Sequence, residues 1–133
     1  MNISLDSNQV TEQYQSLGDE LMVFTNGLDW DKAILHCEIY SSMIAKERWL
    51  EFNNKEVWVG NDIPDDIREK TSNSCYFLKD VIFNLTGDRI WGLTFTLYSD
   101  GKFEIDYDYD KPEDYEETDD IITGDEISQT FLK

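Results

Sequence analysis

The most constraining feature of this sequence is a pair of alternating segments on either side of a Ser-Asp-Gly turn. Between Trp91 and Tyr98 apolar residues alternate with threonines, and between Phe103 and Asp110 apolar or aromatic residues alternate with acids. Alternation with a period of two is typical of β-strands that bury one face. The sequence therefore predicts a β-hairpin over residues 91–110.

The turn determines how these two strands pair. A two-residue loop would set Leu97 against Glu104 and would mix apolar and acidic side chains on one face. A three-residue loop with Gly101 in the left-handed conformation instead pairs Leu97 with Phe103. All the apolar side chains then share one face. The opposite face carries Thr94, Thr96, Glu104, Asp106 and Asp108.

Length and charge limit the class of protein. A chain of 133 residues that is 40% hydrophobic and 14% aromatic fits one globular domain, residues 1–133. Its formal net charge is -18, and twelve acids against one base, Lys111, lie between Glu104 and Glu126. Such a field repels nucleic acid and anionic membranes and attracts a basic partner. We therefore expect no direct nucleic-acid or membrane binding.

The segment before the hairpin predicts two amphipathic helices. The first begins after Asp6 or Ser7 and ends at Asn26-Gly27, with Leu28 packing just beyond. Its apolar stripe is Val10, Tyr14, Leu17, Leu21, Phe24 and Leu28. The second begins in the polar segment 60–66 around Pro64 and ends near Gly87. Its stripe is Ile67, Thr71, Cys75, Leu78, Ile82 and Leu85.

Between these helices the pattern changes to three strands, over residues 33–40, 43–52 and 56–59. A tight turn at Asn53-Asn54 would pair Trp49 with Trp58, so we expect both faces of this part of the sheet to be partly covered. After the hairpin, a loop containing Pro112 and a capping box at 123–126 predict a short last helix. The expected fold is α+β, an antiparallel sheet of about five strands, a three-stranded meander plus the C-terminal hairpin, packed with two long amphipathic helices and that short helix.

The residue types that carry enzyme chemistry are sparse. The one histidine, His36, adjoins Cys37 in a predicted strand, and neighbours in a strand point to opposite faces. No zinc motif, Ser-His-Asp set or phosphate-binding glycine loop is present. We therefore expect no enzyme and no cofactor. Cys37 and Cys75 are interpreted as reduced core thiols, and the lack of a signal peptide predicts a cytoplasmic protein.

The acids of the hairpin are compatible with two kinds of metal site or with an ordinary solvated edge. Asp106, Asp108, Asp110 and Glu117 match positions one, three, five and twelve of a calcium-binding EF-hand loop. However, Lys111 stands where the loop needs glycine, and a strand leads in. A two-metal nuclease would need acids that converge from separate elements, with a lysine or histidine to assist. The solvated edge is the better interpretation of these acids, and no metal is expected.

The hairpin W-G-L-T-F-T-L-Y-S-D-G-K-F-E-I-D-Y-D-Y, from Trp91 to Tyr109, resembles the C-terminal signature of YezG-type immunity proteins, which are antitoxins. Asp62-Ile63-Pro64 resembles the entry to the second helix of that family. The resemblance implies a cytoplasmic immunity protein that binds a cognate toxin, often the C-terminal nuclease domain of a large effector, in contact-dependent growth inhibition or another polymorphic toxin system. An acidic inhibitor suits this role, because a nuclease must present a positive groove to phosphates.

The acidic hairpin face and the loop that follows it are the predicted partner-binding site. Its residues are Asp106, Asp108, Asp110, Glu113, Asp114, Tyr115, Glu116 and Glu117. Tyr107 and Tyr109 are further aromatic candidates, although the position of Tyr107 in the alternation favours the core. A partner-binding site around Trp49 and Trp58 is an alternative location. The alternative function is an acidic nucleic-acid mimic or adaptor that binds a basic host protein.

Overall fold

The computed structural model of the 133-residue chain describes residues 7–111. Its elements, in chain order, are α1 (Ser7–Thr25), β1 (Lys32–Ile39), β2 (Ile44–Phe52), β3 (Lys55–Val57), α2 (Asp65–Thr86), β4 (Gly92–Tyr98) and β5 (Phe103–Asp108). The strands form one antiparallel sheet in the order β3-β2-β1-β4-β5. This confirms an α+β fold with a five-stranded antiparallel sheet and two helices. The predicted short C-terminal helix lies outside the described residues.

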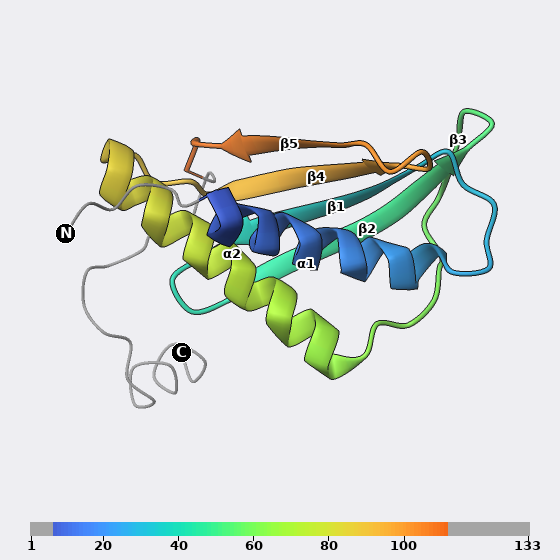
Figure 1. The fold of residues 1–133 in the computed structure, drawn as a ribbon, viewed down its shortest axis with the longest axis horizontal. Coiled ribbons are helices and arrows are strands. Elements are labelled where there is room, and N and C mark those ends of the chain that lie inside the picture. Colours follow the sequence, from blue (N-terminus) through green and yellow to red (C-terminus); the bar gives the residue numbers. More distant parts are fainter. Residues whose placement is uncertain (1–6, 112–133) are drawn as a thin grey trace, which may run out of the picture.

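Both helices lie on the same face of the sheet (Figure 1). The core fills the space between them, with Leu17 and Leu21 from α1 and Leu78 from α2 packed against Leu35 and Phe95 of the central strands. Neither α1 nor α2 covers the opposite face, but Ile34, which lies there beside Trp49, is only 5% exposed, so this side is partly covered near the meander. The side that neither helix covers is called the open face below.

The first helix follows its predicted stripe, with one correction. Leu17, Leu21 and Phe24 are buried, and Gly27, with φ of 77°, provides the left-handed residue after the helix. Leu28 does not pack beyond the helix end, because its side chain is 41% exposed.

Within residues 7–111, neither helix combines enough length with enough apolar residues to cross a membrane.

The second helix is continuous through its polar middle. Thr71 is buried there, and its hydroxyl donates to the carbonyl of Ile67 over 3.0 Å, which satisfies the side chain inside the helix. The predicted polar cap is wrong, since Pro64 occupies the N-cap position without a side-chain hydrogen bond. Gly87, with φ of 77°, ends the helix as expected.

The two turns set the registers of the sheet. Asn53 and Asn54 have φ of 51° and 63°, as a two-residue hairpin turn requires, and they pair Leu50 with Val57. The third strand is shorter than predicted, because β3 ends at Val57. In the second hairpin Gly101 has φ of 92°, and the Tyr98 amide donates to the Lys102 carbonyl over 2.8 Å. The predicted pairing of Leu97 with Phe103 is confirmed.

The two cysteines are free and buried in the core, as the sequence predicted. Cys37 lies on β1 and Cys75 on α2. A hydrogen bond with the Cys75 thiol, together with burial, raises the pKa of the Cys37 thiol well above its usual range. Because the thiolate is the reactive form, Cys37 is a packing residue at neutral pH.

Candidate functional site

The structure describes three of the predicted site residues and leaves the rest outside the described range. Asp106 and Asp108 lie on β5 with exposed side chains on the open face, and Asp110 follows the end of that strand. The amide of Asp110 donates to a carboxylate oxygen of Asp108 over 2.9 Å, which turns the chain away at the strand end. The remaining predicted residues, outside the described part, are Glu113, Asp114, Tyr115, Glu116 and Glu117.

The acidic surface extends well beyond the hairpin. Residues directly opposite one another in an antiparallel pair share a face, so the strand registers place carboxylates from four strands on the open face. These seven residues, which we call the acidic face, are Glu38, Glu47, Glu51, Glu56, Glu104, Asp106 and Asp108. The sequence pattern predicted only the hairpin members, because the other acids join this surface through the order of the strands in the sheet.

Within residues 7–111, few cations lie on the same face as these acids. Lys32 lies there and forms a salt bridge with Glu51, with Nζ and Oε2 3.3 Å apart. Both side chains are partly exposed, so water screens this pair. Three of the acids lie on β5: Glu104, Asp106 and Asp108. Among the described residues, none of them forms a hydrogen bond or salt bridge to a cation. The surface there is an anionic patch open to a cationic partner.

A row of four side chains crosses the middle of the open face, from Glu47 through His36 and Thr94 to Asp106. The Nδ1 atom of His36 lies 2.9 Å from the Thr94 hydroxyl oxygen, so the imidazole is held by the neighbouring strand. Cys37 points into the core, as expected of a strand neighbour, and His36 has no thiol beside it. The row offers hydrogen-bond acceptors and negative charge rather than an activated nucleophile.

The carboxylates are spread along strands instead of converging. Asp106 and Asp108 follow one another on the same side of β5, and their partners across the sheet are Thr94 and Gly92. Within residues 7–111, no group of three or more His, Cys, Asp or Glu side chains is placed to hold a metal ion.

The aromatic candidates divide between the two faces. Tyr107 lies on the helix-covered face, where its hydroxyl is 2.9 Å from that of Tyr14, as its position in the alternation predicted. Burial and this hydrogen bond raise the pKa of Tyr107 above its usual range. On the open side of the meander, the Trp49 and Trp58 rings stack with centroids 4.6 Å apart, and Trp58 is 52% exposed. This stacked pair borders the acidic face and is a candidate anchor for a partner.

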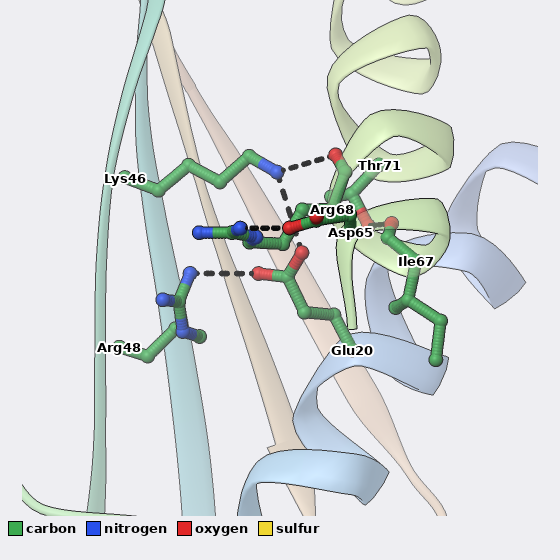
Figure 2. A network of polar contacts seen from close by, with 7 residues as sticks. All are labelled: Glu20, Lys46, Arg48, Asp65, Ile67, Arg68 and Thr71. Atoms are coloured by element: carbon green, nitrogen blue, oxygen red, sulfur yellow. Dashed lines mark hydrogen bonds and ion pairs between the residues drawn. The ribbon is translucent and has the colours of Figure 1, made fainter. Parts of the chain in front are cut away.

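A buried ionic cluster on the other face escaped the sequence analysis (Figure 2). Glu20 of α1 is completely buried and meets Lys46 and Arg48 of β2, at 3.3 Å and 3.0 Å. Lys46 also donates to the main-chain carbonyl of Arg68 on α2 over 2.8 Å. The signal was present in the poor alternation of the second strand, whose helix-facing side carries these two cations. This cluster ties both helices to the sheet.

The sequence matches no family model and no curated protein.

Proposed function

We propose that this protein is a cytoplasmic immunity protein that binds and neutralises a cognate toxin domain. The toxin would be a basic nuclease effector of contact-dependent growth inhibition or another polymorphic toxin system. In this proposal the protein performs no chemistry and needs no cofactor. It acts by occupying the cationic surface with which the toxin holds nucleic acid.

The observation that carries the proposal is the acidic face. Its seven carboxylates lie on one side of a sheet whose other side is anchored by two helices, so they are held on a firm scaffold. A surface with so many fixed negative charges resembles the phosphate array that a nuclease groove attracts. Complementary charge raises the rate of encounter and disfavours partners of like charge.

The sequence supplies a second, separate support. The acidic face includes Glu104, Asp106 and Asp108, which lie within the hairpin that resembles the YezG-type signature. In that interpretation the hairpin is both a folding unit and part of the docking surface. Asp110 and the acids of the loop that follows would extend the same negative field along the chain.

The first experiment is co-expression in bacteria with the toxin domain encoded by the neighbouring gene. We expect the wild-type protein to restore growth, and the Asp106→Lys/Asp108→Lys variant to protect weakly, because two reversals place positive charge against a basic partner. Asp80→Lys is the matched control. Asp80 lies on α2, the helix on the opposite face of the sheet, and its side chain is 68% exposed. Reversal of its charge should leave protection intact.

The outcomes separate the two parts of the proposal. Failure of the wild-type protein to protect, or the absence of a neighbouring toxin gene, would overturn the immunity function and favour the acidic adaptor. Full protection by the Asp106→Lys/Asp108→Lys variant would keep the immunity function but remove this part of the acidic face from the interface. Reversal at Asp114 would then test the loop.

A further inference from the structure

Strand β5 is an edge of the sheet. It pairs with β4 on one side, and no other strand of the described chain lies on its other side (Figure 1). An edge strand presents unpaired main-chain N–H and C=O groups, and these form a template on which another strand can pair. At six residues, β5 is also twice as long as β3, the three-residue strand at the opposite edge.

The hydrogen-bond pattern identifies which groups are presented. The Tyr98 amide donates to the Lys102 carbonyl, so Tyr98 and Lys102 form a hydrogen-bonded pair at the turn. Such pairs alternate along an antiparallel ladder with pairs whose main-chain groups point away from each other. The N–H and C=O groups of Phe103, Ile105 and Tyr107 therefore point outward from the sheet, away from β4.

The two faces of β5 differ sharply in chemistry. Its open-face side chains are Glu104, Asp106 and Asp108, all exposed. Its helix-side chains are Phe103, Ile105 and Tyr107, and Phe103 is 47% exposed despite its size. A strand added to this edge would meet carboxylates on one face and apolar or aromatic side chains on the other.

An apolar groove lies beside the exposed ring of Phe103. It has a volume of about 360 Å³ and is lined by α1, β4 and the start of β5. Met22 of α1 lines the groove and is 54% exposed, and Phe95 and Leu97 of β4 contribute apolar surface. Side chains on the helix-facing side of an added strand would find this apolar surface next to the edge, which gives a place for their burial.

We propose that the β5 edge binds an extended segment of the basic partner as an additional antiparallel or parallel strand. This inference rests on the proposed function for the identity of the partner. The segment would alternate lysine or arginine, placed against Glu104, Asp106 and Asp108, with apolar residues placed beside Phe103 and the groove. Main-chain hydrogen bonds supply affinity in this mode, and the alternating side chains supply specificity.

The β5 edge has three candidate occupants: a basic strand of a partner, a second copy of this chain, and residues 112–133 of the chain itself. Charge favours the basic strand of a partner. A second copy of this chain, paired edge to edge, would bring Glu104, Asp106 and Asp108 against the same three acids. Residues 112–133 of the chain itself contain eight acids and one base, so their field opposes that of β5. A lysine- or arginine-bearing strand replaces both repulsions with attraction.

The test uses the full-length protein and a synthetic peptide as long as β5, alternating lysine with valine, with both ends blocked. Amide hydrogen exchange is followed by NMR with and without the peptide at low ionic strength. We expect exchange at Phe103, Ile105 and Tyr107 to slow roughly tenfold or more, because these amides gain acceptors. The amides of Glu104 and Asp106 should change little, since they already face β4.

Two control peptides sharpen the test. The same peptide with glutamate in place of lysine should give no protection, and a lysine peptide with proline at its centre should bind more weakly, because proline removes a ladder donor. Binding of the lysine peptide without protection of these three amides would overturn the edge proposal, as would equal binding of the glutamate peptide or no binding at all. Protection of the same amides in the free protein would show that the edge is already occupied by its own chain, or by a second copy if the protection depends on concentration, and would also overturn it.

A variant pair tests the edge within the toxin assay. Ile105→Pro removes an outward amide while the bonds of Glu104 and Asp106 to β4 remain, whereas Ile105→Ala trims the side chain and keeps the amide. We expect Ile105→Pro to lose toxin affinity relative to Ile105→Ala, with circular dichroism and the thermal midpoint reporting whether each is folded. Equal affinity of two folded variants would reject the edge but leave the immunity function standing, since that function is tested by wild-type protection.

Discussion

Glu20 on α1 accepts a hydrogen bond from the guanidinium of Arg48 on β2 over 3.0 Å, and its side chain is completely buried. Its other carboxylate oxygen lies 3.3 Å from the ammonium of Lys46. A carboxylate removed from water is costly unless it is paired, so these two cations determine where α1 can sit on the sheet. Through the Lys46 bond to the carbonyl of Arg68, the same contact also positions α2.

Removal of Glu20 should therefore be strongly destabilising. We expect Glu20→Ala to lower the free energy of unfolding by about 3 kcal/mol, at the lower end for buried pairs because Arg48 is partly exposed. Urea denaturation followed by tryptophan fluorescence measures this change. Open-face binding of a basic partner should be unaffected in the folded fraction, since the cluster lies on the other face.

An apolar replacement of the whole cluster provides the control. The triple variant Glu20→Leu, Lys46→Met and Arg48→Met removes the buried carboxylate together with both cations, and we expect it to recover most of the lost stability. If the triple variant is no more stable than Glu20→Ala, the unpaired cations are not the cause of the lost stability. The loss would then come from the packing of α1.

The contact between the Tyr14 and Tyr107 hydroxyls, 2.9 Å apart, links α1 to the edge strand. We expect Tyr107→Phe to lower the free energy of unfolding by about 1 kcal/mol through loss of this hydrogen bond. Tyr14→Phe should cost a similar amount, and the double variant should cost less than the sum, because the two changes remove one interaction. Additive losses in urea titrations would contradict a direct bond between them.

The same tyrosine predicts a pH dependence. Burial and the bond to Tyr14 raise the pKa of Tyr107 above the value of about 10 expected for the unfolded chain. Above about pH 10 the unfolded state loses this proton while the folded state keeps it, so the free energy of unfolding falls as pH rises. The stabilisation is complete below that pH. Urea titrations at a series of alkaline pH values should show that the free energy of unfolding falls less steeply with pH for Tyr107→Phe than for the wild type. Parallel curves for the two proteins would exclude Tyr107 as the source of the pH dependence.

Two glycines should respond to alanine in opposite directions. At Gly18, within α1, a methyl group would meet only the Phe95 ring at 3.8 Å, so Gly18→Ala should stabilise the protein by roughly 0.5–1 kcal/mol through helix propensity. At Gly92 a methyl group would lie 2.8 Å from the main-chain carbonyl oxygen of Cys37, so Gly92→Ala should be destabilising. Thermal midpoints of the two variants check both signs. A Gly92→Ala protein as stable as the wild type would contradict the close approach of β4 to β1.

The association rate of a basic partner should depend more steeply on salt than its dissociation rate. Because the acidic face steers encounter, we expect the association rate to fall roughly tenfold or more as the ionic strength increases from about 0.05 to about 0.5 M, with a smaller change in the dissociation rate. Stopped-flow or surface plasmon resonance measurements separate the two rates. The Asp106→Lys/Asp108→Lys variant should show a shallower salt dependence, whereas an unchanged slope would place the steering charges elsewhere.

The local parts of the fold could be predicted from sequence. The hairpin register follows from the alternation around Gly101, and the stop of each helix follows from Gly27 and Gly87, because turn conformation and strand parity depend on neighbouring residues. Leu28 was misplaced because a helical stripe does not reveal where the covering layer ends. The candidate site was predicted only in the part that one hairpin contains.

The sequence by itself determined the strand faces, the turn geometry and the excess of negative charge, since each of these is set by residues close together along the chain. Only the tertiary structure decided that β1 lies between β2 and β4, which brings Glu38 and Glu47 onto the same surface as Asp106. It also decided that Glu20 is buried between two cations. The physical reason is that strand order and buried ion pairs arise from contacts between distant segments, whose free energy depends on how the layers pack and not on local pattern.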